Sequence, residues 1–141
     1  MDRERRLLFR QGALILFVSA LLGIVTAVPV PHPGKWMAAH LGGLLTGVLI
    51  IAFGALWMDV RLAESTRKLA LRMGLTAAWV GLLGNVYAAL VNLPGPASDP
   101  GRLPDAPWHL PVFFVILAVV VPCTLGSFFL VWKGLRPDAR P

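Results

Sequence analysis

Apolar residues fill four long stretches of the chain, and the segments between them are charged or rich in proline. The stretches cover approximately residues 11–30, 37–57, 73–92 and 111–132, and none contains Asp, Glu, Lys or Arg. A helix needs about 20 mostly apolar residues to cross a hydrocarbon core of about 30 Å. The pattern therefore predicts an all-α integral membrane protein, a four-helix bundle that forms a single transmembrane domain over residues 1–141.

Composition excludes the other broad classes of protein. The 141 residues are 57% hydrophobic and 14% charged, whereas a soluble domain carries about 25% charged residues. Disordered chains are poor in the aliphatic residues that dominate this sequence. The single cysteine, Cys123, cannot form an internal disulfide. The first stretch follows a basic segment and has no convincing cleavage site, so we expect it to be a retained span rather than a signal peptide.

Basic residues are distributed unequally between the two sides of the predicted bundle. Eleven of the thirteen precede the first span, fill the second connection or follow the fourth span: Arg3, Arg5, Arg6, Arg10, Arg61, Arg67, Lys68, Arg72, Lys133, Arg136 and Arg140. Only Lys35 and Arg102 fall on the other side. Because cytoplasmic loops carry the Lys/Arg excess, both termini are predicted to be cytoplasmic, in the inner (plasma) membrane. The charge thus favours contact with the lipid bilayer, and no nucleic-acid motif accompanies it.

The connections differ in kind. Residues 29–36 and 93–111 are rich in proline, which fixes the backbone and removes amide donors, so we expect ordered caps without helix. The charged segment Asp59–Leu71 could continue the helices beyond the membrane. Pro122 lies in the middle of the fourth span and should kink that helix or free a carbonyl there.

Polar side chains at membrane depth are the most informative residues in so apolar a chain. Serine and threonine can donate to carbonyls of their own helix, which we expect of Ser19, Thr26, Thr76, Thr124 and Ser127. Gln11 is expected to be structural, and Asn92 to end a helix. His40 is different, because it is the only histidine inside a span; His32 and His109 fall in the outer connections and are expected to be solvated.

Two interpretations of His40 remain open on the residues alone. Neutral imidazole binds haem iron and other transition metals, but a histidine can also hydrogen-bond across helices to hold a bundle together. Gly43, Gly47 and Gly54 share the helix face of His40. Such a face usually packs against a partner helix; alternatively it accepts a flat ligand, with His40 at its edge. The third span has a matching stripe of small residues: Gly74, Ala77, Gly81, Gly84 and Ala88.

Depth brings several polar groups to the same half of the bilayer. At about 1.5 Å per residue, His40 lies about 6 Å, Asn85 about 12 Å and Thr46 about 15 Å from the outer ends of their spans. Asn85 and Tyr87 can donate hydrogen bonds to an oxygen or nitrogen of a bound substrate. Tyr87 can equally be an aromatic residue of the membrane interface.

Two short segments resemble a known family. The run A-A-H-L-G-G-L-L-T-G (Ala38–Gly47) and the run G-N-V-Y (Gly84–Tyr87) resemble the second and third spans of small four-helix membrane isomerases that include hydroxylaminobenzene mutase and styrene oxide isomerase. The family pattern has a His, a Gly a few residues on, and Asn-Gly six and seven residues after the His. His40 and Gly47 match this pattern, while Thr46 stands where the family usually has Asn.

The resemblance implies a haem b protein that acts as a homotrimer, with haem at subunit contacts and His40 as the iron ligand. Ferric iron would activate a small, apolar, aromatic substrate as a Lewis acid, with no net redox change. The reaction would convert a hydroxylaminobenzene into an aminophenol, or an aryl epoxide into an aldehyde. We expect Gly43 and Gly47 to contact the cofactor, and Asn85, Thr46 and Tyr87 to be the catalytic residues.

Two other function classes stay open. A haem- or quinone-associated electron-transfer protein with six-coordinate haem would need a second strong ligand, and no second histidine lies inside a span. A small transporter or non-catalytic membrane subunit would also fit the four spans. Proton-coupled transporters usually need an intramembrane carboxylate, and all seven acidic residues lie outside the spans.

Overall fold

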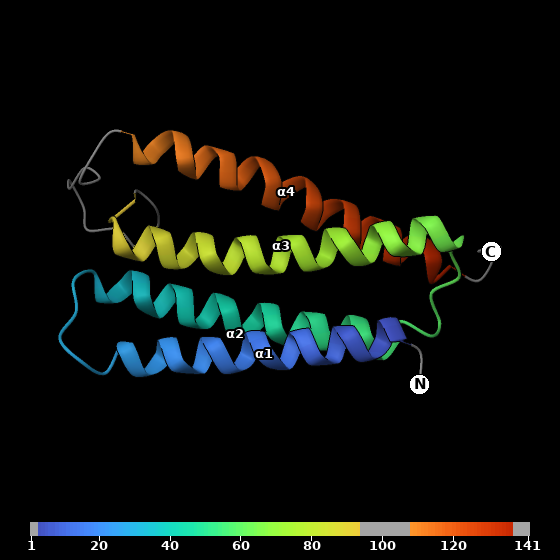
Figure 1. The fold of residues 1–141 in the computed structure, drawn as a ribbon, viewed down its shortest axis with the longest axis horizontal. Helices are drawn as coiled ribbons and strands as arrows, with labels where there is room; N and C mark the ends of the chain where they lie inside the picture. Colours follow the sequence, from blue (N-terminus) through green and yellow to red (C-terminus); the bar gives the residue numbers. More distant parts are fainter. Residues whose placement is uncertain (1–2, 94–107, 137–141) are drawn as a thin grey trace.

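A computed structural model describes residues 3–93 and 108–136, and over these ranges the chain is helical without strands. The four helices are α1 (Arg3–Val25), α2 (Pro33–Leu56), α3 (Glu64–Leu90) and α4 (His109–Gly134) (Figure 1). Each is long and apolar enough to cross a membrane. The predicted all-α fold with four spans is therefore confirmed.

The helices run alternately up and down, so sequence neighbours are also neighbours in space (Figure 1). α1 packs mainly on α2 and α3 mainly on α4, while the α2–α3 contact joins the two pairs. The core includes Ile15 of α1, Ile50 and Phe53 of α2, and Leu82 of α3. An even number of spans brings both ends of the chain to one end of the bundle (Figure 1). Which side of the membrane that end faces stays a prediction.

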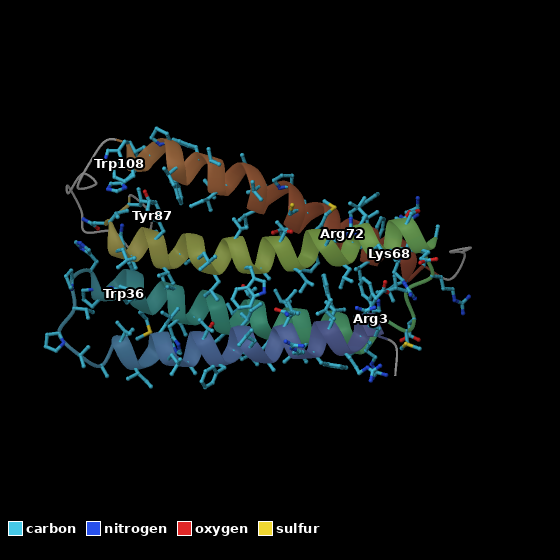
Figure 2. The ribbon with its side chains drawn as sticks, viewed as in Figure 1. Arg3, Trp36, Lys68, Arg72, Tyr87 and Trp108 are labelled. Carbon is cyan, nitrogen blue, oxygen red and sulfur yellow. The ribbon has the colours of Figure 1, made fainter. Side chains whose placement is uncertain are left out.

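Basic side chains gather at one end of the bundle, as predicted. Figure 2 shows Arg3, Lys68 and Arg72 at the end where the chain begins, and Trp36 and Trp108 at the opposite end. Arg102 and Arg140, which also entered the prediction, lie outside the described residues.

Two tryptophans link the helices through polar partners. Trp57 Nε1 donates to Glu4 Oε2 at 3.0 Å, and Trp79 Nε1 donates to Gln11 Oε1 at 2.9 Å. The second bond joins α3 to α1 and accounts for Gln11 as a structural residue. Because a buried indole N–H without an acceptor is costly, each glutamate or glutamine oxygen stabilises the position of its tryptophan.

The helix bounds differ from the predicted spans for identifiable reasons. α1 ends at Val25 rather than near residue 30, because the amide and hydroxyl of Thr26 both turn back to the Gly23 carbonyl, at 3.2 and 2.6 Å. α2 already begins at Pro33, so the expectation of no helix in residues 29–36 was wrong for its second half. Proline suits the first helical turn, where amide donors have no helical partner.

The other ends also follow local chemistry. α3 begins at Glu64, so the charged connection does continue this helix. Asn92 follows the end of α3 with a φ of 48°, and Leu93 N–H donates to the Ala88 carbonyl at 3.2 Å. This closing turn confirms Asn92 as a helix end.

α4 begins earlier than predicted, and Pro122 lies within it without ending the helix. His109 and Pro111 belong to the helix although the segment 93–111 was expected to lack one; residues 94–107 of that segment lie outside the described ranges. Pro122 sits within the continuous helix. Since proline has no N–H, the carbonyl of Ala118 loses its usual helical donor.

Candidate functional site

A groove of about 240 Å³ runs along the middle of α2, α3 and α4. Its walls are largely apolar, with Ile50, Phe53 and Val120 among them, and four side chains with polar groups line it: Thr46, Asn85, Thr124 and Ser127. Thr46 and Asn85 were both candidates from depth alone, and the structure brings them into one space. Thr124 and Ser127 were expected only to bond within their own helix.

Small residues create the groove. Gly42, Gly74, Ala77 and Gly81 all line it. A Cβ atom added to Gly74 or Gly81 would meet its nearest neighbour from another helix at 3.7 or 3.8 Å, an ordinary contact. The stripe of small residues in the third span therefore lines the groove from Gly74 to Gly81 without close helix packing. Gly84, farther along the stripe, instead packs closely on Ile116 of α4.

The polar groups of the groove offer complementary hydrogen bonding. Thr46 Oγ1 donates to the Gly42 carbonyl at 2.8 Å, and Ser127 Oγ donates to the Thr124 carbonyl at 2.9 Å. Both hydroxyl oxygens can then only accept. Asn85 is exposed in the groove, close to Gly42, and no residue of the described chain hydrogen-bonds to its amide. Asn85 is therefore the available donor, with acceptors on the facing helices.

His40 lies elsewhere, against α1. Its Nδ1 atom is 2.7 Å from the Ser19 carbonyl oxygen. A carbonyl only accepts, so Nδ1 donates, and in the neutral ring Nε2 keeps its lone pair. The ring lies on Gly23, where an added Cβ would come within 2.7 Å of Cε1. Within the described ranges Nε2 has no hydrogen-bond partner. Histidines that bind metals commonly anchor their other nitrogen in this way.

Gly43 and Gly47 form the packing surface between α1 and α2. A Cβ on Gly43 would lie 2.0 Å from Ser19 Oγ, and one on Gly47 would lie 2.7 Å from Leu16 Cγ. Both glycines are buried. Of the two interpretations of this face, the structure supports helix packing, because α1 leaves no room for a flat ligand over these glycines.

Tyr87 points away from the groove. Its hydroxyl and Nδ1 of His109 share a hydrogen bond of 2.6 Å, and the ring of Trp108 lies 3.7 Å from that of His109. The group sits where α3 ends and α4 begins (Figure 2). His109 is only 6% exposed, so the expectation that it is solvated was wrong. His109 lies in the first turn of α4, where Tyr87 of α3 packs against it and shields it from solvent.

His40 and Thr46 lie at the two borders of the exposed side of α2. Successive helical residues are about 100° apart, and Leu41 and Leu45, which are 50% and 68% exposed, lie between them. His40 borders α1, while Thr46 borders the groove. One protomer therefore does not bring His40 together with Thr46 and Asn85.

The donor set limits what His40 could bind. No three His, Cys, Asp or Glu side chains gather within the described part of the chain. His40 is therefore not part of a cluster of three or more such side chains in the described ranges. A cofactor that brings its own equatorial ligands, such as a haem, needs only one or two from the protein, and His40 fits that requirement.

Comparisons with known proteins agree with this architecture. A family described as styrene oxide isomerase matches residues 4–136. Hydroxylaminobenzene mutase HabA of Ectopseudomonas oleovorans is 30% identical over 135 residues, covering 91% of this chain and 96% of the relative. Hydroxylaminobenzene mutase HabB of the same organism is 26% identical over 138 residues, covering 94% and 80%. No solved structure matches. The relatives are mutases, and this chain of four membrane-spanning helices belongs to the styrene oxide isomerase family.

Proposed function

We propose that the protein is a redox-neutral membrane mutase that converts a small arylhydroxylamine into an aminophenol. The family and the mutase relatives support an isomerase. In this reaction the N–O bond breaks, a C–O bond forms on the ring, and a proton moves from the ring carbon to nitrogen. The product has the atoms of the substrate. The second chemistry of the family, aryl epoxide to aldehyde, is the alternative.

The observation that carries the proposal is the groove, which combines apolar walls with Asn85 and Thr46 at mid-membrane. Its volume is about 240 Å³. For comparison, an apolar cavity of about 150 Å³ holds benzene, so a ring with one polar substituent fits. The Asn85 amide would donate to the oxygen or nitrogen of that substituent, and the Thr46 oxygen would accept from its N–H or O–H. Apolar walls keep water from competing for these hydrogen bonds.

We further propose that haem b is the cofactor and His40 its axial ligand. The support is the orientation of His40: Nδ1 is anchored on the Ser19 carbonyl and Nε2 is free to bind. Ferric haem would supply a Lewis acid for the substrate oxygen. Thr46 and Asn85 would orient the substrate and hold its polar atoms while the proton moves.

This assignment calls for more than one protomer. His40 and the groove lie at opposite borders of the exposed side of α2, so a contact that covers Leu41 and Leu45 would place His40 of one protomer near the groove of another. We propose a homo-oligomer assembled in this way. The trimer follows from the family resemblance, and the exposed apolar sides of the helices are available for such a contact.

The test is a direct assay of the purified membrane protein. Phenylhydroxylamine and styrene oxide are each added without reductant or oxidant, and products are separated by chromatography. We expect aminophenol from the first substrate, at a rate well above that of Asn85→Ala. Phenylacetaldehyde from the second substrate alone would replace the mutase assignment with the epoxide chemistry. If the protein forms neither aminophenol nor phenylacetaldehyde, the proposed function is overturned.

A further inference from the structure

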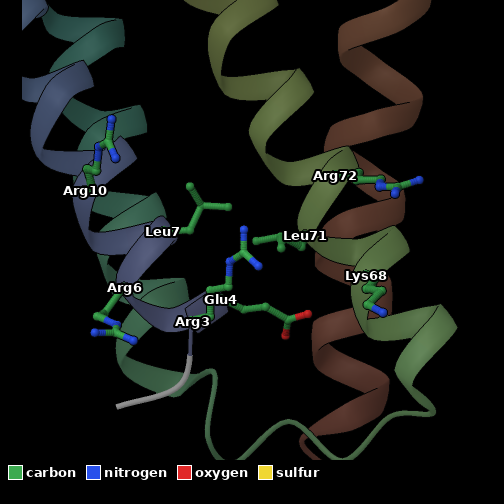
Figure 3. A pocket seen from close by; sticks show the side chains of 8 residues that line it. All are labelled: Arg3, Glu4, Arg6, Leu7, Arg10, Lys68, Leu71 and Arg72. Carbon is green, nitrogen blue, oxygen red and sulfur yellow. The ribbon is translucent and has the colours of Figure 1, made fainter.

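A second pocket, which shares no lining residue with the groove, lies between the N-terminal parts of α1 and α3 (Figure 3). Its volume is about 780 Å³. Five basic side chains line it: Arg3, Arg6, Arg10, Lys68 and Arg72. Figure 3 shows the guanidinium of Arg3 in the space between the two helices, toward Leu71. Glu4 is the one acidic residue that the described part of the chain contributes to the lining.

Among the described residues, most of this positive charge has no counter-charge. Glu4 is already engaged, because its Oε2 atom accepts from Trp57 and lies 2.9 Å from Arg67 Nε. Lys68 pairs with Glu64, whose pKa is lowered by this hydrogen bond and charge. Arg3, Arg6, Arg10 and Arg72 have no carboxylate partner anywhere in the described chain. The pocket thus carries a net positive charge that an anion would neutralise.

The depth of the pocket matches the headgroup region of a bilayer. The uncharged stretch of α1 begins after Arg10, and that of α3 begins after Arg72. The headgroup region on each side is about 5–7 Å thick, and Arg3 to Arg10 span about 10 Å along the helix axis. The basic residues therefore extend from the edge of the apolar stretch through the headgroup region, which holds the lipid phosphates.

Two leucines add an apolar surface to the same pocket. Leu7 and Leu71 line it from opposite helices, and both are half-buried. A soluble phosphate would gain nothing from these side chains, whereas the upper part of an acyl chain would bury them. Cationic side chains above and leucines below match a molecule with an anionic head and an apolar tail.

We propose that this pocket is a specific binding site for an anionic phospholipid, with its phosphate at the Arg3 guanidinium between the helices and with Arg6, Arg10 and Arg72 around the pocket supplying further positive charge. Arginine suits the task, because its planar guanidinium binds phosphate oxygens in pairs. Basic pockets between membrane helices bind lipid headgroups of this kind. The lipid fills the space between α1 and α3, and thereby holds the α1–α2 and α3–α4 pairs together. This site is independent of the proposed reaction.

Native mass spectrometry of the purified protein tests the proposal, with phosphatidylglycerol, phosphatidylcholine and pyrophosphate as probes. The test variant is Arg3→Gln with Arg72→Gln, one change on each helix. The control is Lys133→Gln with Arg136→Gln, which removes the same charge from the same end but outside the pocket. Arg6→Gln with Arg10→Gln serves as a second test variant in case the first does not fold.

We expect wild type and control to retain phosphatidylglycerol and the pocket variants to bind it at least about tenfold more weakly. Equal losses in control and test variants would mean diffuse attraction to the basic end and would overturn the proposal. Equal retention of phosphatidylcholine would overturn it too. Pyrophosphate bound as tightly as the lipid would make the occupant a soluble phosphate and reject the lipid assignment.

Discussion

His40 Nδ1 lies 2.7 Å from the backbone carbonyl oxygen of Ser19, and this bond joins α2 to α1 at membrane depth. The acceptor is a main-chain atom, so substitution of Ser19 does not remove it. Gly23 lies beneath the imidazole and leaves it just enough space. Together these contacts set the direction of the ring and leave Nε2 as its free coordinating atom.

His40→Ala should abolish haem binding, because no other described side chain offers an equivalent nitrogen at that place. The measurement is the absorption spectrum of detergent-purified protein expressed with added haem. His32→Asn is the matched control; asparagine tolerates the left-handed backbone of that position, where φ is 55°. Gly23→Ala, which pushes the ring aside, should weaken the haem band without removing the ligand. A wild type that shows no haem band would reject the cofactor assignment.

Asn85→Ala and Thr46→Val should each lower kcat/KM with phenylhydroxylamine. A lost hydrogen bond in an apolar site costs about 1–3 kcal/mol, which corresponds to about five- to 150-fold in rate. Thr76→Val is the control, since Thr76 lies on α3 outside the groove and is exposed. If Asn85→Ala and Thr46→Val are as active as the Thr76→Val control, the groove does not take part in the reaction.

Gly43→Ala should lower stability, whereas Gly81→Ala should lower activity without lowering stability. The first places a methyl group 2.0 Å from Ser19 Oγ and should lower the free energy of unfolding by about 1–3 kcal/mol. The second meets Val120 at 3.8 Å, so thermal stability should not fall, while the narrowed groove should lose activity. Thermal denaturation in detergent, followed by fluorescence, measures the first effect, and the product assay measures the second. A Gly43→Ala protein as stable as wild type would contradict the α1–α2 packing.

Tyr87→Phe should affect stability more than catalysis. Removal of the hydroxyl leaves His109, which is 6% exposed, without its partner, and should destabilise the protein by about 1 kcal/mol. Activity with phenylhydroxylamine should stay within about twofold of wild type, because the side chain does not reach the groove. A fall of more than about tenfold in kcat at unchanged thermal stability would restore Tyr87 as a catalytic residue.

The four helices were predictable because each apolar run is long enough to cross a bilayer and no other pattern competes with it. Their exact ends were not. α1 and α3 extend into charged residues, and α2 starts on Pro33, since the ends depend on turn hydrogen bonds that hydropathy does not register.

The candidate site was predictable only in part. Depth correctly grouped Thr46 with Asn85, because both lie on facing, antiparallel helices. Depth could not distinguish Tyr87 from Asn85. These residues are two positions apart on α3, so their side chains point in widely different directions around the helix. The partner of His40 is a carbonyl of Ser19, and a main-chain acceptor has no signature in the amino-acid sequence. Ser127 lines the groove because of how α4 packs on α3, and the sequence pattern does not specify that packing.

The groove opens on the side of the protomer at mid-membrane rather than at either end of the bundle, since its lining comes from the middle of α2, α3 and α4. An apolar substrate would then arrive from the hydrocarbon phase, where partitioning concentrates it far above its level in water. The enzyme would respond to the amount dissolved per volume of membrane. An apparent KM expressed per volume of buffer would rise as more lipid or detergent is added, even though the affinity of the groove stays the same.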